Sequence, residues 1–191
     1  KNMKNPSEFI SLTKNTLLKD IKVIDKSEKI NDDLSIVINN GRISDIVKKA
    51  PNTFNGEIIE NEDAILMPGL FDMHVHLREP GREDEETLLT GSLAAANGGF
   101  TSIACMPNTD PPIDTQEVVN FIKEKSHNIL VDIFPIAAIT NNRKGIELAP
   151  IAELVEAGAV AISDDGSPVM NAEIMRRALE YSKMFNIPIL T

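Results

Sequence analysis

The sequence has little of what marks secreted or membrane proteins. Cys105 is the only cysteine in 191 residues, so no disulfide can form within the chain. No apolar run approaches the roughly 20 residues that a membrane-spanning helix needs. The start of the chain, residues 1–15, is polar and lacks the apolar stretch of a signal peptide. A cytoplasmic protein that binds no membrane is therefore the expectation.

Aromatic residues and positive charge are also scarce. Tryptophan is absent and aromatics make up 4% of the chain, so aliphatic side chains and methionine must fill the core. The 19 basic residues are outnumbered by 29 acidic ones, which gives a net charge of −10. A surface of this sign repels nucleic acid and anionic lipid, and we expect neither as a partner. A small anionic substrate is not excluded, because a local arginine and a metal ion can outweigh the overall field.

The pattern of apolar and polar residues changes near residue 66, which predicts two domains. Residues 1–66 hold short β-rich runs, and the turn Asn39–Arg42 between apolar stretches predicts a hairpin in a small antiparallel sheet. Residues 67–191 alternate strand-like runs with helical stretches. The predicted strands are 69–75, 101–106, 131–138, 160–163 and 187–190, and the predicted helices are 83–97, 115–125, 147–156 and 172–185.

This alternation is typical of βαβ units with a parallel sheet, the α/β class. A (β/α)₈ TIM barrel takes about 250 residues, so residues 67–191 would supply about its first half. The predicted architecture is thus half of such a barrel preceded by a small β-sandwich-type domain over residues 1–66. Because half a barrel leaves strand edges open, we expect it to need its other half, or self-association, to be stable.

The first candidate for chemistry is the pair His74 and His76 at the end of the first barrel strand. Residues two apart on a strand point to the same face, so both imidazoles can reach one metal ion. The ends of barrel strands are also where this fold builds its active sites. The alternative is two surface histidines, which the apolar neighbours Val75 and Leu77 disfavour.

Two further polar groups follow the first and second strands. Arg78 lies two residues beyond His76, where its guanidinium could hold a substrate carboxylate by two hydrogen bonds; alternatively it is a surface arginine paired with Glu79 or Asp84. Asn108 follows the second strand in a proline-rich loop and can donate and accept hydrogen bonds to a substrate. A simple proline-rich turn explains that loop equally well. The neighbouring Cys105 is expected to be buried rather than nucleophilic.

The adjacent carboxylates Asp164 and Asp165 end the fourth predicted strand. Neighbouring residues on a strand point in opposite directions, so at most one of the two should face the barrel axis and bind metal. The other could cap a helix or orient a neighbour. The alternative is an ordinary Asp-Asp-Gly turn.

Three motifs together carry a resemblance to a known family. His-Val-His-Leu-Arg-Glu-Pro-Gly at 74–81, Met-Pro-Asn-Thr at 106–109 and Asp-Asp-Gly-Ser-Pro-Val at 164–169 resemble the bacterial type I dihydroorotases of the amidohydrolase superfamily. The resemblance implies that His74, His76 and Asp165 bind one or two zinc ions. It also implies that His76, Arg78 and Asn108 contact the substrate.

The implied reaction is the reversible cyclisation of N-carbamoyl-L-aspartate to L-dihydroorotate in pyrimidine biosynthesis. Members of this family carry two further metal-binding histidines and a catalytic aspartate after later strands, and no such residues occur by residue 191. No catalytic residue is therefore expected here, and the 191-residue chain alone is expected to be inactive.

Two alternatives remain at this point. One is another cyclic amidohydrolase, such as an allantoinase or hydantoinase. The other is an inactive dihydroorotase-like chain that supports aspartate transcarbamoylase, which the retained metal ligands disfavour. A homo-oligomer and an aspartate transcarbamoylase partner both stay open.

Overall fold

The computed structural model describes residues 15–61 and 63–191, which fall into two compact units that divide between Pro68 and Gly69. Each unit has its own sheet and its own core. Within the described residues, no helix has the length and apolar character required to cross a bilayer.

The first unit is a five-stranded sheet in the order β3-β2-β1-β4, with β5 also paired to β1. Its strands are β1 (Thr16–Asp25), β2 (Ile30–Asn39), β3 (Arg42–Val47), β4 (Glu57–Glu60) and β5 (Ile65–Leu66). The predicted hairpin is confirmed: Asn39 pairs with Arg42 across the turn, where Asn40 and Gly41 have the positive φ that such tight turns require. The core consists of Ile21, Val23, Leu34 and Ile36.

The prediction of a wholly antiparallel sheet is wrong for its last two strands. Only β1, β2 and β3 pair antiparallel, whereas β4 and β5 run parallel to β1. Parallel neighbours need a crossover rather than a tight turn. Residues 48–56 supply such a connection between β3 and β4, which the local turn signals could not reveal.

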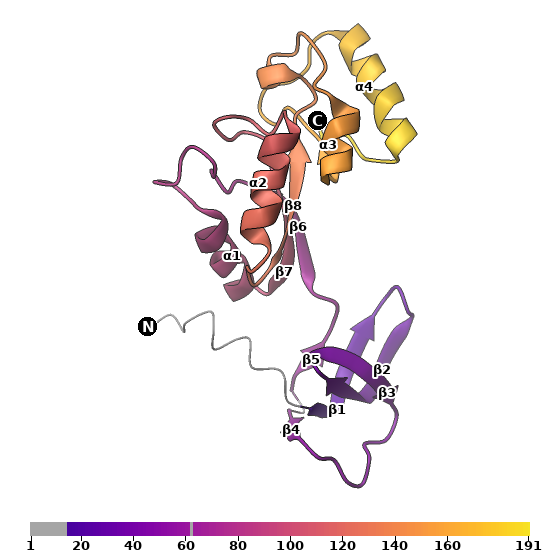
Figure 1. Ribbon diagram of the computed structural model, residues 1–191. Coiled ribbons are helices and arrows are strands. Elements are labelled where there is room, and N and C mark those ends of the chain that lie inside the picture. Colours follow the sequence, from indigo (N-terminus) through magenta and orange to yellow (C-terminus); the bar gives the residue numbers. More distant parts are fainter. Residues whose placement is uncertain (1–14, 62) are drawn as a thin grey trace. The chain divides into compact units, whose positions relative to one another are not determined.

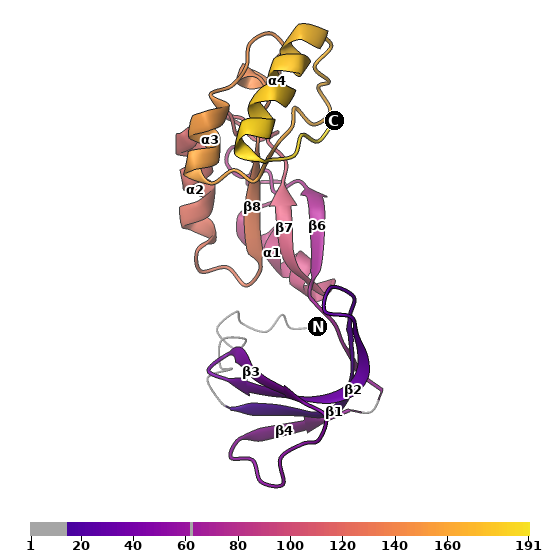
Figure 2. The same ribbon diagram turned by 90° about the vertical axis from the view of Figure 1, so that its right-hand side faces the viewer.

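The second unit alternates strands and helices as predicted. In chain order its elements are β6 (Leu70–Val75), α1 (Leu88–Asn97), β7 (Phe100–Cys105), α2 (Gln116–Ser126), β8 (Asp132–Ala137), the 3₁₀ turn η2 (Asn141–Arg143), α3 (Ile151–Ala157), β9 (Ala161–Ile162) and α4 (Ala172–Phe185). The strands form a parallel sheet in the order β6-β7-β8-β9. Figure 2 shows β6, β7 and β8 side by side, and Figure 1 shows α1 and α2 along one face of them.

The predicted fifth strand, 187–190, is reduced to one parallel bridge between Ile162 and Ile189. Its neighbour β9 has only two residues, so it offers a fifth strand a very short edge. Helix α1 begins five residues later than predicted, at Leu88, because the side chain of Thr87 caps it and accepts a hydrogen bond from the backbone of Thr90. Helix α3 begins at Ile151, directly after Pro150.

Both faces of the parallel sheet are apolar. On the helix-covered face, Ile103 and Cys105 of β7 belong to the main core, together with Leu88, Ile122 and Leu154 from α1, α2 and α3. The alternate residues Ala104 and Met106 form a smaller cluster with Ile136 and Ala161. In a barrel this second cluster corresponds to the interior filling.

Cys105 is expected to be chemically inert in the folded protein. Burial raises the pKa of its thiol to about 12, so only about one thiol in ten thousand is ionised at pH 8. We expect no reaction with a disulfide reagent at pH 8 in native buffer and complete reaction in guanidinium chloride, measured by absorbance of the released thiolate. Rapid modification of the native protein would contradict the burial of this side chain.

Candidate metal centre

The two histidines lie at the carboxyl end of β6. His74 is the penultimate residue of β6, and His76 is the first residue beyond the strand. Their rings meet edge to face with centroids 5.1 Å apart. The carboxylate of Asp72 accepts a hydrogen bond of 3.0 Å from the backbone of His74, which fixes this end of the strand.

Asp165 joins the histidines from the loop after β9. Its Oδ1 lies 3.3 Å from Nε2 of His74, and one donor atom from each of His74, His76 and Asp165 falls within 4.8 Å of the other two. The Asp165 side chain is only 12% exposed, whereas that of His74 is 56% exposed. The fold therefore brings Asp165 to two histidines that lie about 90 positions earlier in the sequence, at the edge where the parallel strands end.

Asn108 reaches the same place from the loop after β7. Its side-chain oxygen lies 2.9 Å from Nδ1 of His76. In the tautomer with its hydrogen on Nδ1, His76 donates to this amide oxygen and the lone pair of Nε2 is left free. Metal-binding histidines are commonly held in this way. Asn108 was predicted from the sequence as a substrate contact, and its contact with His76 was not foreseen.

Arg78 is half-buried in the loop that follows His76. It adopts a positive φ of 56°, and its Nε lies 3.4 Å from Oε2 of Glu85. The loop is fastened to the next one, because the backbone of Asp110 donates a 3.0 Å hydrogen bond to the carbonyl of Pro80. Gly81 allows this approach: at its φ of 105° a Cβ atom would lie 2.1 Å from the carbonyl oxygen of Asp110.

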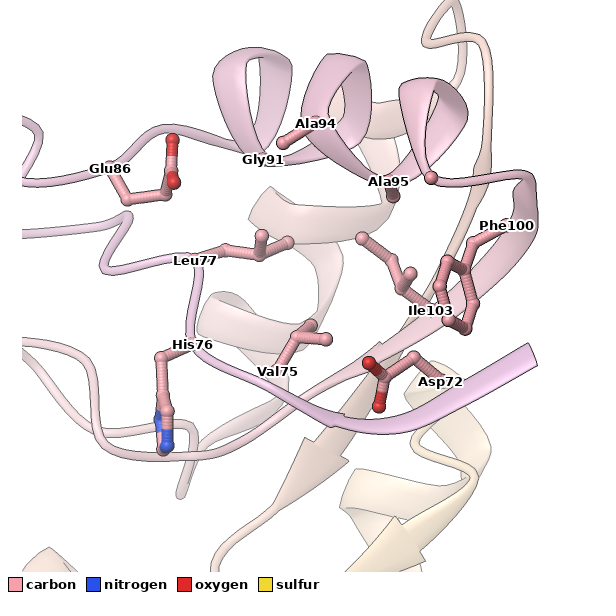
Figure 3. A pocket seen from close by; sticks show the side chains of 11 residues that line it. Asp72, Val75, His76, Leu77, Glu86, Gly91, Ala94, Ala95, Phe100 and Ile103 are labelled. Atoms are coloured by element: carbon pink, nitrogen blue, oxygen red, sulfur yellow. The ribbon is translucent and has the colours of Figure 1, made fainter. Parts of the chain in front are cut away.

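The other side of β6 faces a cavity with a mainly apolar lining. The cavity, of about 250 Å³, is lined by residues of β6, α1 and β7, including Val75, Ala95 and Ile103. In Figure 3, Leu77 points into the space beneath α1, while the ring of His76 points away from the helix. The side chain of Leu77 is therefore buried in the core, whereas that of its neighbour His76 points towards Asn108.

The donor set suits zinc. Imidazole nitrogen and carboxylate oxygen are ordinary zinc ligands, and two such atoms bound about 2.0–2.2 Å from one ion at a tetrahedral angle would be roughly 3.3–3.5 Å apart. The separation of 3.3 Å between His74 Nε2 and Asp165 Oδ1 agrees with this geometry. When Nδ1 of His76 donates to Asn108, Nε2 of the ring is free to bind a metal.

Comparison with known proteins identifies the family. Residues 63–188 match the family described as Dihydro-orotase-like. The chain belongs to the dihydroorotase-like family. A protein named dihydroorotase from Geotalea daltonii is 47% identical over 177 residues, which cover 92% of this chain and 42% of that protein. Another from Pelotomaculum thermopropionicum is 53% identical over 140 residues, 73% of this chain and 33% of that protein. The chain thus spans less than half the length of these relatives.

Solved structures of similar fold support the predicted architecture of this dihydroorotase-like chain. The L-hydantoinase (dihydropyrimidinase) from Arthrobacter aurescens matches with a TM-score of 0.75 at 19% identity, over 92% of this chain and 40% of that one. A dihydroorotase structure matches with a TM-score of 0.60 at 14% identity, over 92% of this chain and 50% of that one. The predicted family and the predicted fold class, a partial amidohydrolase barrel with a separate N-terminal β unit, are both confirmed.

Several polar residues in the loops after β7 and β8 were not predicted from the sequence as site residues. Thr140 and Arg143, from the loop after β8, contact Asp164, and Arg143 also lies near Asp165. Asp114, from the loop after β7, accepts a hydrogen bond from the backbone of Asn142. No local motif marks these residues, and only their position after a predicted strand could have drawn attention to them.

Proposed function

We propose that the whole protein is a zinc-dependent dihydroorotase that interconverts N-carbamoyl-L-aspartate and L-dihydroorotate. The observation that supports this most directly is the convergence of His74, His76 and Asp165 at the carboxyl edge of the parallel strands. The edge is the one at which barrel enzymes bind their substrates, and the chain's family is that of the dihydroorotases.

His74, His76 and Asp165 would hold one or two zinc ions. A bound zinc ion supplies Lewis acidity, which stabilises negative charge that develops on a carbonyl oxygen. Asn108 keeps the hydrogen of His76 on Nδ1 through its 2.9 Å contact. Asp72 holds the backbone of His74 in place from the strand itself.

Arg78 would bind the substrate's carboxylate, because a guanidinium can give a carboxylate two parallel hydrogen bonds. Its contact with Glu85 is at 3.4 Å and partly exposed to solvent, so an incoming carboxylate could replace it at small cost. Asn108 and His76 complete the proposed substrate contacts. The general base expected of this family is not among the residues described, and no residue of this chain is assigned that role.

The substrate is a small dicarboxylate, no nucleic acid or membrane is involved, and the protein acts in the cytoplasm. Association into a homo-oligomer or with aspartate transcarbamoylase is compatible with the sequence. A hydantoinase or allantoinase is less well supported, because Arg78 and the Asp-Asp-Gly motif match dihydroorotases.

Turnover measurements test the function. We would assay the 191-residue chain alone and the same chain joined to the remaining part of the Geotalea daltonii relative, with dihydroorotate, hydantoin and allantoin as substrates. We expect the chain alone to be inactive, since its relatives are more than twice as long. The joined protein is expected to hydrolyse dihydroorotate only.

Zinc content and circular dichroism of the joined protein serve as the folding control. A folded, zinc-loaded protein that hydrolyses hydantoin or allantoin but not dihydroorotate would overturn the proposed substrate. One that hydrolyses none of the three would overturn the proposed activity.

A further inference from the structure

The loop between β8 and α3 is held by a buried carboxylate from the loop after β9. Oδ1 of Asp164 accepts hydrogen bonds from the backbone of Ile139 at 2.8 Å and of Thr140 at 3.0 Å. Its Oδ2 accepts a hydrogen bond of 2.5 Å from the hydroxyl of Thr140. Asp164 is 2% exposed and Thr140 is fully buried, so these bonds are shielded from water and each is costly to lose.

Thr140 extends this network through its hydroxyl. The oxygen that donates to Asp164 also accepts a 2.9 Å hydrogen bond from the backbone of Gly145. On the other side of the loop, Oδ2 of the buried Asp114 accepts a 2.7 Å bond from the backbone of Asn142. The loop is therefore fixed at both of its flanks by carboxylates from the two neighbouring loops.

The same loop contains Arg143, whose side chain lies near Asp165. Nε of Arg143 donates a 3.1 Å hydrogen bond to the carbonyl of Asp164, and its Nη2 lies 4.0 Å from Oδ2 of Asp165. Arg143 and Asp165 both have a positive φ, 57° and 51°. Such a conformation persists in residues other than glycine only where the surroundings hold it. The backbone of Asp165 is held further by a 2.9 Å bond to the hydroxyl of Ser163.

We infer that Thr140, Asp164 and Arg143 form a positioning network that presents Asp165 to the metal. In this network Oδ2 of Asp165 faces Arg143, and Oδ1 lies beside His74, where it would be available to a metal ion. The inference rests on the proposed function, because it takes Asp165 to be a metal ligand. Thr140 and Asp164 act through Asp165 and are not among the residues that would hold the metal.

The network is tested by measuring the zinc affinity of two variants, Thr140→Val and Thr140→Ser. Valine keeps the shape of threonine but removes the hydroxyl, which leaves Oδ2 of Asp164 and the N–H of Gly145 without this partner. We expect zinc binding about 10- to 100-fold weaker, as for other groups that support metal ligands. Thr140→Ser keeps the hydroxyl and should bind zinc like the unsubstituted protein. Affinity is measured by competition with a chromophoric chelator.

The visible spectrum of the cobalt(II)-substituted protein supplies a second readout, because it reports the geometry around the metal. We expect it to change in Thr140→Val and not in Thr140→Ser. The matched control is Ile122→Val, which removes one methylene from the buried core of α2. It should lower the free energy of unfolding while leaving zinc affinity and the cobalt spectrum unchanged.

The outcomes separate this inference from the proposed function. Unchanged zinc affinity and cobalt spectrum in Thr140→Val would overturn the network, as would an equal loss in Ile122→Val. If Thr140→Val does not fold, Arg143→Gln replaces it, and an unchanged cobalt spectrum in that variant would overturn the network. Absence of zinc binding in the unsubstituted protein would overturn both. A zinc effect of Thr140 in a protein without dihydroorotase activity would support the network and contradict only the function.

Discussion

Replacing Asp165 with asparagine is expected to weaken zinc binding by more than 100-fold. Removing a group that only supports a metal ligand already weakens metal binding by about 10- to 100-fold. Asp165 is proposed as a ligand itself, so its loss should weaken binding further. The substitution keeps the size of the side chain but removes the negative charge 3.3 Å from Nε2 of His74. Zinc affinity is measured by chelator competition, and any dihydroorotase activity of the whole protein should fall with it.

Asp132→Asn is the matched control for this change. Asp132 is an exposed aspartate at the start of β8, at the end of the strand remote from the metal residues. The same loss of one carboxylate there should leave zinc affinity unaltered. Zinc binding that survives intact in Asp165→Asn would remove this residue from the proposed metal centre.

Replacing Lys125 with methionine is expected to destabilise the protein by about 3 kcal/mol. Glu79 follows His74 and His76 in the chain, and its side chain is 1% exposed. Its carboxylate accepts a 2.7 Å hydrogen bond from the backbone of Leu88, at the start of α1, and forms an ion pair with Lys125 of α2. Removing one partner leaves the other charge buried and uncompensated, which typically costs 3–5 kcal/mol, and the half-exposed lysine favours the lower end of that range. Urea unfolding measures the change.

A double substitution and a neighbouring lysine make this prediction specific. Glu79→Gln combined with Lys125→Met removes both charges, so most of the lost stability should return. Lys123 is exposed on the same helix, and no ion pair within the described part of the chain involves it; Lys123→Met should change stability by less than about 0.5 kcal/mol. Equal losses in the Lys123 and Lys125 variants would show that the ion pair with Glu79 is unimportant.

Glu79 also shows where local reasoning about the loops was insufficient. In the sequence it stands between Arg78 and Pro80, a position that suggests only a surface partner for Arg78. In the structure it is one of the most buried charged residues described, and Arg78 pairs with Glu85 instead. The partners of Glu79 lie 9 and 46 positions further along the chain, beyond the reach of any local pattern.

Asp164 and Asp165 also differ in how far the sequence could predict their roles. The alternation of side chains on a strand predicted that only one of them would face the metal, and the family motif assigned that role to Asp165. The role of Asp164 could not be derived from the sequence, because the donors to its carboxylate are Ile139 and Thr140, more than 20 positions earlier. A buried carboxylate needs such donors, and only the packed loops supply them.

The sequence by itself determined the order of strands and helices, the family, and the residues whose chemistry suits a metal. These properties depend on hydrophobic periodicity, turn residues and short motifs, all of which are local. The tertiary structure alone decided the parallel pairing of β4 and β5, the reduction of the fifth barrel strand to one bridge, and the convergence of His74, His76 and Asp165. Each of these depends on which distant segments pack together, because hydrogen-bond partners and burial are fixed only when the chain has folded.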